Sequence, residues 1–135
     1  MKQEHESLVT GNAVDEGQSD AISPGWFIGH FVSKKANLRH TDDVEVKWGI
    51  HHSGDEKLNT RTNETSTTLT ILISGSFLMK FGTGDSEALL ERPGDYALFA
   101  PGAEYKWYAL AESVVLTVRW PSIPNSRSGT AADRR

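Results

Sequence analysis

Short apolar runs separated by turn residues recur through the middle of the chain, and no stretch of useful length repeats with a helical period. Strands bounded by Gly, Pro, Asn and Asp produce this pattern. The sequence therefore predicts about eight strands and an all-β fold, either an antiparallel jelly roll or a sandwich of the immunoglobulin type. The predicted strands span residues 26–32, 44–52, 67–73, 77–81, 88–90, 96–99, 105–110 and 113–120.

The alternation is clearest in the strand predicted at 44–52. Successive side chains of a strand point to opposite faces of the sheet. We interpret the segment as a half-buried strand whose apolar face packs on the core, which places His52 inside and leaves His51 exposed. One face carries Val44, Val46, Trp48, Ile50 and His52, and the other carries Glu45, Lys47 and His51.

Both ends of the chain are polar. Residues 1–23 are acidic with few large apolar side chains, and residues 123–135 are rich in Ser, Gly, Ala and Arg. Such compositions bury too little apolar surface to offset the entropy of ordering, so we expect both segments to be disordered. The intervening residues 24–122, about one hundred in all, are then a single domain.

Composition narrows the chemistry. The chain has 135 residues, a net charge of -4 and no Cys, so disulfides, Cys-ligated zinc and thiolate catalysis are excluded. Basic residues do not cluster with aromatic ones, and we expect no nucleic-acid partner. No apolar segment reaches membrane-spanning length and the start of the chain lacks a signal-peptide pattern, so we expect a cytoplasmic protein without a membrane partner.

Two motifs resemble those of the cupin superfamily. Gly94-Asp95 leads into a predicted strand, Pro101-Gly102 makes the next turn, and Tyr105 stands three residues later, where cupins usually carry a metal-binding His. Ile73-Ser74-Gly75 resembles the end of the first cupin motif. The resemblance implies a cupin-type jelly-roll β-barrel, also called a double-stranded β-helix, in one domain. The segments 46–51 and 114–122 are similar to those of short bacterial single-domain cupins.

The resemblance also bears on metal binding and assembly. Counting back from Gly75, the two His positions and the Glu position of the first motif hold Thr62, Glu64 and Thr68. With Tyr105 in the fourth position, none of the usual ligands is present. The resemblance therefore implies no tightly bound cofactor, whereas a divalent Fe, Mn, Zn or Ni ion would need an altered set such as His52, Glu64 and Tyr105. It also implies a homodimer.

The resemblance places a ligand site in the barrel mouth. If Thr68 faces inward like its cupin counterpart, strand parity turns Thr70 inward as well, and Tyr105 and Trp107 on the facing strand. We take these four residues as candidates for a polar and aromatic cavity. Tyr105 would donate a hydrogen bond or a proton to a ligand, or else its ring simply packs in the core.

Further candidates come from other positions. His52 is a candidate base or a structural histidine, and Trp48 shares its face. Glu64 is either a ligand carboxylate or part of a solvated loop. We expect His30 to be exposed, and Arg119 either to hold an anionic ligand or, as we favour, to form a surface pair with Glu45.

Three functions remain open. We favour a small-molecule-binding protein without a tightly bound metal. The alternatives are a metal-dependent oxygenase or isomerase with altered ligands, and a metal-free epimerase or isomerase with His52 as base and Tyr105 as acid. The loops at 53–66 and 82–87 are expected to shape the pocket, so the sequence does not name a ligand.

Overall fold

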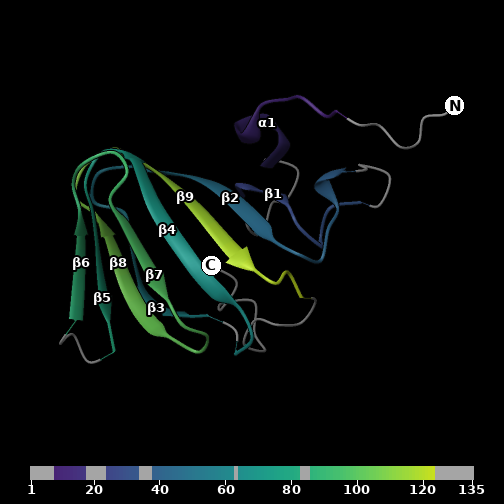
Figure 1. Ribbon diagram of the computed structural model, residues 1–135. Helices are drawn as coiled ribbons and strands as arrows, with labels where there is room; N and C mark the ends of the chain where they lie inside the picture. The colour runs from purple at the N-terminus through teal and green to yellow at the C-terminus, as the bar shows by residue number, and fades with distance from the viewer. Residues whose placement is uncertain (1–7, 18–23, 34–37, 63, 83–85, 124–135) are drawn as a thin grey trace, which may run out of the picture.

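Two antiparallel sheets build the molecule (Figure 1). The computed structural model describes residues 8–17, 24–33, 38–62, 64–82 and 86–123. The all-β jelly-roll fold predicted from the sequence is confirmed. The five-stranded sheet has the order β1 (Trp26–Ile28), β2 (Glu45–His51), β9 (Ser113–Trp120), β4 (Thr67–Ser74) and β7 (Tyr96–Phe99), and the four-stranded sheet has the order β3 (Glu56–Arg61), β8 (Glu104–Ala109), β5 (Phe77–Phe81) and β6 (Ser86–Leu90).

Seven of the predicted strands lie within two residues of their observed ends, and β5, β7 and β9 match them residue for residue. The first predicted strand is shorter than expected, since β1 ends at Ile28. β3 is a correction, because we interpreted residues 53–66 as a loop. Its sequence is polar and its pairing with β8 shifts register between Lys57 and Thr60, so it carries no clean alternation.

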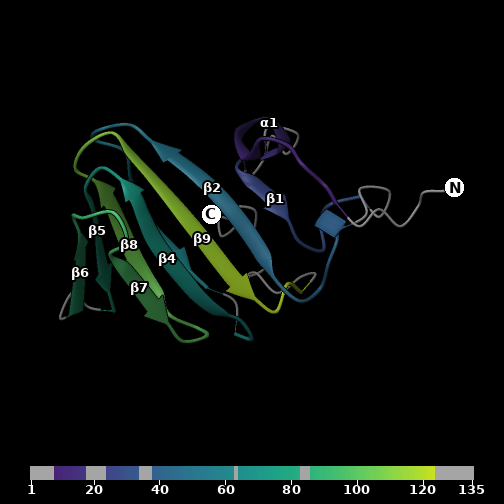
Figure 2. The same ribbon diagram turned by 45° about the horizontal axis from the view of Figure 1, so that its top comes forward.

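The N-terminal part also departs from expectation. We predicted no ordered element before residue 24, yet a short helix, α1 (Ala13–Gly17), packs against β1 and β2 (Figure 2). The Asn12 side chain caps it by accepting a hydrogen bond from Val14 N at 2.9 Å. Glu16 on this helix lies 3.3 Å from Arg39, which ties the segment to the chain beyond β1. The rest of the predicted end segments, residues 1–7, 18–23 and 124–135, lies outside the described residues.

The apolar core lies between the two sheets. β4, β7 and β9 contribute from one sheet, and β5, β6 and β8 contribute from the other, so the core is made by residues far apart in the sequence. Its rings contact one another, with Phe99 5.1 Å from Tyr105 between centroids. The buried members are Leu72, Phe77, Met79, Leu90, Phe99, Tyr105, Ala109 and Val115.

The turns that carried the cupin resemblance are structural. Gly75 has φ 103°, and a Cβ there would lie 2.3 Å from the Glu112 carbonyl oxygen, so only glycine fits between β4 and β5. The Asp95 carboxylate accepts hydrogen bonds from the backbone N–H groups of Arg92 and Glu91, both at 2.9 Å. These bonds lower the pKa of Asp95 and hold the turn before β7.

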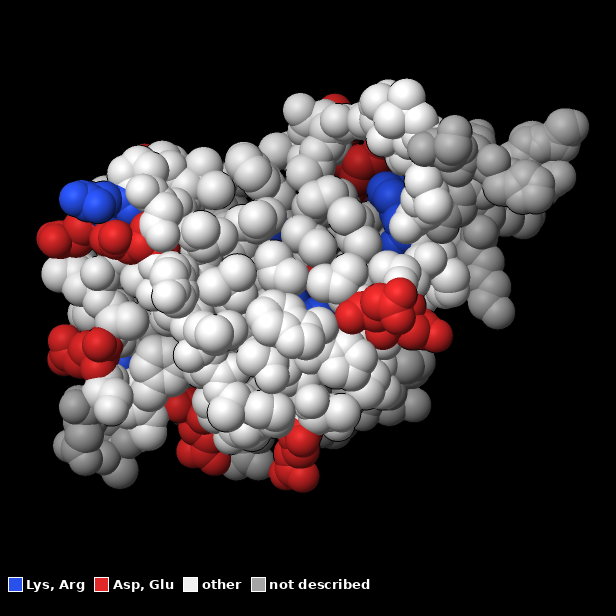
Figure 3. Space-filling view, viewed as in Figure 1, with Lys and Arg blue, Asp and Glu red and all other residues white. Residues whose placement is uncertain are grey.

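The outer face of the five-stranded sheet is apolar across four strands. The register aligns side chains of β2, β9, β4 and β7 into two cross-strand rows without a charged residue. Charged side chains in Figure 3 lie mostly towards the edges of the view, and its centre is largely uncharged. No helix among the described residues is long and apolar enough to cross a membrane. The rows are Val46–Val118–Leu69–Leu98 and Trp48–Leu116–Ile71–Tyr96.

Candidate functional site

The inner face of β2 carries its polar residues, which reverses our expectation. Glu45 and Gly49 are buried, and Lys47 and His51 line a cavity between the sheets. The regular apolar alternation of this strand belongs to the outer face described above. The reversal has a physical reason. The buried carboxylate of Glu45 is paired with a residue of another strand, and the alternation along β2 alone does not reveal that partner.

Arg119 on β9 neutralises Glu45. The Nη1 group of Arg119 lies 3.1 Å from Glu45 Oε2, and both side chains are only 1% exposed. Its Nε donates to the hydroxyl of Thr68 on β4 at 3.3 Å. The register places the three residues directly opposite one another. The pair that we predicted therefore exists, but it is buried in the inner face and not on the surface.

His30 and Ser122 complete this buried network. The Ser122 hydroxyl donates to Glu45 Oε1 at 2.8 Å and accepts the backbone N–H of His30 at 3.0 Å. Its single proton is thus used, so the His30 Nδ1, 2.7 Å away, must be a donor to the same oxygen. The expectation that His30 is exposed was wrong, since its side chain is 13% exposed.

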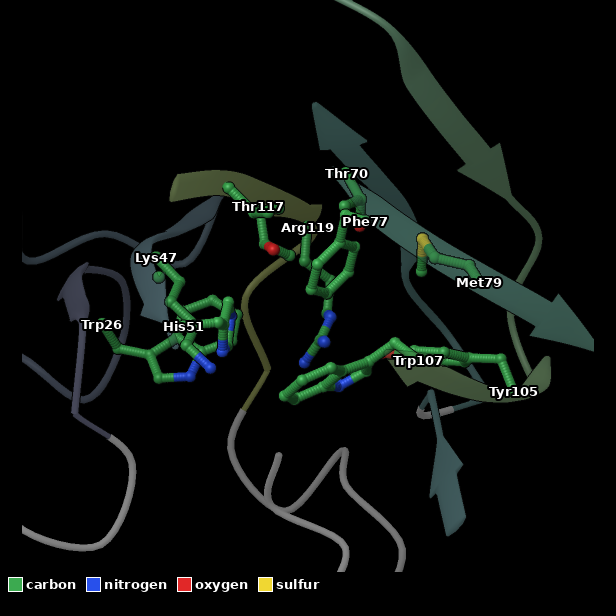
Figure 4. Close-up of a pocket in the computed structure, with 12 residues that line it drawn as sticks. Trp26, Lys47, His51, Thr70, Phe77, Met79, Tyr105, Trp107, Thr117 and Arg119 are labelled. Atoms are coloured by element: carbon green, nitrogen blue, oxygen red, sulfur yellow. The ribbon is translucent and has the colours of Figure 1, made fainter. Parts of the chain in front are cut away.

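A second polar row lies beside the first. Lys47, Thr117 and Thr70 are directly opposite one another on β2, β9 and β4. All three line the inner cavity together with Arg119, and Figure 4 shows the Arg119 guanidinium directed into this space. The cavity has a volume of about 40 Å³, room for roughly three water-sized groups.

Aromatic rings form one wall of the cavity. The His51 ring lies 4.5 Å from Trp107 and 5.4 Å from Phe77, and the latter two rings stack at 5.1 Å. Burial, with a smaller effect of the Lys47 charge, lowers the pKa of His51 to about 4. His51 is therefore a neutral imidazole at physiological pH. The Arg119 guanidinium lies 5.1 Å from the Trp26 ring on another side of the cavity.

A wider pocket opens next to the inner cavity. Its volume is about 340 Å³, within the range of small-molecule sites. Lys47, Gly49, His51 and Trp107 line both spaces, so the pocket adjoins the cavity, and we call it the mouth. The remaining lining residues come from α1 and the chain before β1 as well as from β2. They are Val14, Pro24, Gly25, Trp48 and Ile50.

The structure brings four sequence-predicted residues together. Thr70, Tyr105 and Trp107 line the cavity, and Thr68 supports Arg119 beside it. Tyr105 is 8% exposed and its ring packs against Phe81 and Phe99. The inward parity expected for β4 and β8 is therefore what the structure shows.

Three other candidates lie elsewhere. The His52 side chain is 75% exposed and its Nδ1 lies 3.2 Å from Glu112, because the inward position of β2 belongs to His51. Glu64 is exposed in the connection between β3 and β4. Trp48 lines the mouth but not the inner cavity, since its side chain is on the outer face of β2.

Several cavity residues were missed as ligand contacts, namely Lys47, His51 and Thr117. The available signal was the placement of Lys47 and His51 on the same strand face as Glu45, together with the paired charges Glu45 and Arg119 in two predicted strands. Register between those strands would have been needed to read that signal.

The residues at the cupin metal positions do not fit a metal ion. A guanidinium cation is hydrogen-bonded to Thr68, at the position of the usual Glu ligand. Thr62 is buried and its hydroxyl lies 3.5 Å from the carbonyl oxygen of Ala103. The described ranges contain no group of three or more His, Cys, Asp and Glu able to hold a metal. Of the altered set, His52 and Glu64 have exposed side chains, whereas Tyr105 is buried in the core.

Comparison with solved structures identifies the fold. KdgF from Halomonas sp. superposes with a TM-score of 0.55 at 18% identity, covering 64% of this chain and 77% of that protein. A cupin superfamily protein from Desulfitobacterium hafniense gives 0.53 at 16%, covering 62% and 72%. An uncharacterized protein with a double-stranded β-helix domain from Klebsiella pneumoniae gives 0.54 at 23%, covering 64% and 68%.

These likenesses show that the chain has the cupin fold, in agreement with the resemblance seen in the sequence. Fold alone does not define an activity, because one fold supports many sites. No protein-family model matches the sequence, and no curated protein matches it. The residues of the site itself are therefore the guide to its chemistry.

Proposed function

We propose that the protein binds a small organic molecule in the inner cavity and its mouth, without a metal at the cupin ligand positions. The observation that carries this proposal is the second polar row. Lys47, Thr117 and Thr70 stand in the interior of a jelly roll, next to a charge network that is already satisfied, and they open to a pocket of about 340 Å³. A hydroxyl such as that of Thr70, which is 4% exposed, is costly to bury unless a partner completes it.

The stacked wall supports the same proposal. A neutral His51 ring and the Trp107 indole offer flat surfaces at the junction of cavity and mouth. Aromatic side chains with a few placed polar groups are typical of ligand sites. We propose that the protein acts in the cytoplasm, which fractionation of cells producing it would test.

The test is a metabolite panel screened by ligand-observed NMR. We expect at least one hit whose signal is lost in Trp107→Ala and weakened in Thr70→Val. Trp120→Ala is the matched control, since Trp120 is 40% exposed on the opposite face of its sheet. Hits that survive both cavity variants, or a panel without any hit, would contradict the proposal.

A metal-free isomerase is the second candidate, and one observation favours it. The cavity holds a neutral imidazole, that of His51, and the phenol of Tyr105 in its lining. An imidazole base and a phenol acid are the groups such a reaction uses. Conversion of a confirmed ligand by the wild type, abolished in both His51→Asn and Tyr105→Phe, would establish catalysis, and unchanged ligand after prolonged incubation would exclude it for that ligand.

We also propose that two copies associate through the apolar outer face. Tyr96 is 62% exposed and Leu98 is 56% exposed at one edge of the cross-strand rows. The rows carry no charge, so pairing a face with its own copy brings no like charges together. Their exposed side chains amount to on the order of several hundred Å² per copy, close to the scale of a stable interface.

We propose that a second copy, and not a segment outside the described ranges, covers this face. The residues outside the described ranges contain Met1 and Ile22 as their only large apolar side chains. We expect light scattering to show a dimer that Leu98→Glu converts to a monomer. Leu89→Glu, at a 48% exposed position of β6 on the other sheet, should leave the dimer intact. A wild-type monomer at high concentration would overturn this assembly.

A further inference from the structure

We propose that the ligand carries a flat aromatic ring that stacks on a platform formed by the rings of His51 and Trp107, with an oxygen-bearing substituent directed towards the inner cavity. This inference rests on the proposed function and adds the chemical class of the ligand. It is drawn from the packing of the two rings, from the glycine beside one of them, and from the residues that line the two adjoining spaces.

The platform is held in place by a third ring. The centres of the His51 and Trp107 rings are 4.5 Å apart, and Phe77 packs against both, stacked on the indole at 5.1 Å and tilted against the imidazole at 5.4 Å (Figure 4). Phe77 is only 3% exposed, so it supports the platform from the core. Side chains that are already ordered lose little further conformational entropy when a ligand binds. The platform is therefore preorganised for a flat partner.

Gly49 leaves space beside the His51 ring. The two residues share the inner face of β2, and a Cβ on Gly49 would lie 3.0 Å from His51 Nε2. Gly49 has no positive φ, so the backbone conformation of the strand does not require glycine here. Glycine weakens a strand, and inside a strand it often marks a site that a ligand approaches closely. Since Gly49 lines both the cavity and the mouth, the space it leaves lies at the boundary between them.

The mouth suits the body of an aromatic molecule. Besides the platform, its wall includes Val14 of α1 and Trp48 and Ile50 of β2, which are apolar or aromatic. A flat ring on the Trp107 indole gains stacking in addition to the burial of its apolar surface, because aromatic rings attract one another in offset and edge-to-face geometries. A saturated ring in the same place gains the burial alone.

The adjoining cavity suits a small substituent with an oxygen atom. Thr70 and Thr117 line this cavity, and a threonine hydroxyl can donate or accept a hydrogen bond. The volume of about 40 Å³ has room for roughly three water-sized groups, which is enough for a hydroxyl or an amide and too little for a second ring. A phenol, an aromatic alcohol or an aromatic amide therefore matches both spaces.

The test compares aromatic probes with their saturated counterparts. The pairs are 4-ethylphenol and 4-ethylcyclohexanol, benzyl alcohol and cyclohexylmethanol, and benzamide and cyclohexanecarboxamide, all uncharged at neutral pH. Each probe is titrated into the full chain by calorimetry and by NMR that follows the indole N–H signal of Trp107. We expect at least one aromatic probe to bind at least about fivefold more tightly than its saturated partner. A saturated ring is no smaller than an aromatic one, so burial of apolar surface alone does not produce this preference.

Variants assign the preference to the platform. Trp107→Leu and His51→Leu should each lower it to less than about twofold, whereas His51→Phe, which keeps a ring beside the indole, should retain it. Gly49→Ala should weaken the binding of aromatic probes, because the added Cβ pushes against the His51 ring. Trp120→Leu is the matched control, since Trp120 is 40% exposed on the opposite face of its sheet, and it should leave the preference unchanged.

Equal binding of the aromatic and saturated probes would overturn the aromatic class and leave the proposed binding function standing. The same conclusion would follow if no aromatic probe bound the folded wild type, or if the preference survived in both Trp107→Leu and His51→Leu. A metabolite panel without any hit would overturn the aromatic class and the proposed function together.

Discussion

Around Arg119 and Thr117, the two faces of the five-stranded sheet have opposite chemistry to most antiparallel sheets. Such sheets usually put apolar residues towards the core and polar residues towards water. Here the rows Glu45–Arg119–Thr68 and Lys47–Thr117–Thr70 face inward, while rows of Val, Leu, Ile and aromatic residues face outward. The inner rows are consistent with a ligand cavity and the outer rows with a protein interface. The comparison teaches that hydrophobicity alone does not decide which face of a strand is buried. The residues that neighbouring strands place opposite that face matter as well.

Removing the buried carboxylate should have the largest effect. We expect Glu45→Ala to lower the free energy of unfolding by about 3 to 5 kcal/mol, because it leaves the Arg119 charge buried without compensation. Urea denaturation measures the change. Glu87→Ala breaks an exposed pair with Lys80 at 4.0 Å and should cost less than about 1 kcal/mol. Equal losses of unfolding free energy in the two variants would mean that Glu45 and Arg119 are solvated. The contrast between the inner and outer faces of the sheet would then be wrong.

Acid should weaken the inner face through His51. Its pKa is about 4 in the folded protein, against about 6.5 when unfolded, so the unfolded chain binds the proton more readily between these values. The free energy of unfolding should therefore fall as the pH is lowered through this window, by about 3 kcal/mol between pH 7 and pH 4 from this group.

The carboxylates also titrate at low pH, so the measurement is a difference between two proteins. His51→Phe keeps a ring against Trp107 and lacks the titrating group. Urea denaturation of both proteins at several pH values isolates the contribution of His51. If the unfolding free energies of the wild type and His51→Phe change with pH in the same way, His51 is more exposed to water than its position in the cavity wall implies.

The smallest effect compares two neighbouring residues on opposite faces. Thr117→Val removes a hydroxyl that makes no hydrogen bond within the described ranges and should stabilise the fold by about 1 kcal/mol, while weakening ligand binding. Val118→Thr makes the reverse change on the outer face and should destabilise by roughly 0.5 to 1 kcal/mol. Thermal unfolding of both proteins gives the two signs. A loss of stability in Thr117→Val would mean that its hydroxyl is already satisfied.

The sequence predicted the strands well, since β-branched runs such as Thr67–Ser74 between glycine turns leave little choice. It also placed Thr70, Tyr105 and Trp107 in the cavity through the cupin resemblance. It misplaced His51 and His52, because a regular apolar alternation was taken to mark the core. It missed β3, a polar strand that pairs with β8 across a register shift.

The site residues that were missed depend on tertiary partners. Nothing local to Lys47 or Thr117 distinguishes an inward residue from a solvated one. Their place follows from the alignment of β2, β9 and β4, which joins positions about seventy residues apart, as in the Lys47–Thr117 pair. The sequence indicated a possible pair between Glu45 and Arg119. It did not predict that this pair is buried.

The Ser122 hydroxyl has a consequence for the order of folding. It joins His30 and Glu45 to a residue beyond the last strand, across sequence separations of 92 and 77. Contacts this distant close late, because the entropy of the intervening loop must be lost first. During synthesis Glu45 therefore stays hydrated until β9 and Ser122 have left the ribosome. We expect β1 and β2 to lack stable structure until then. The chain should fold slowly and in a single cooperative step.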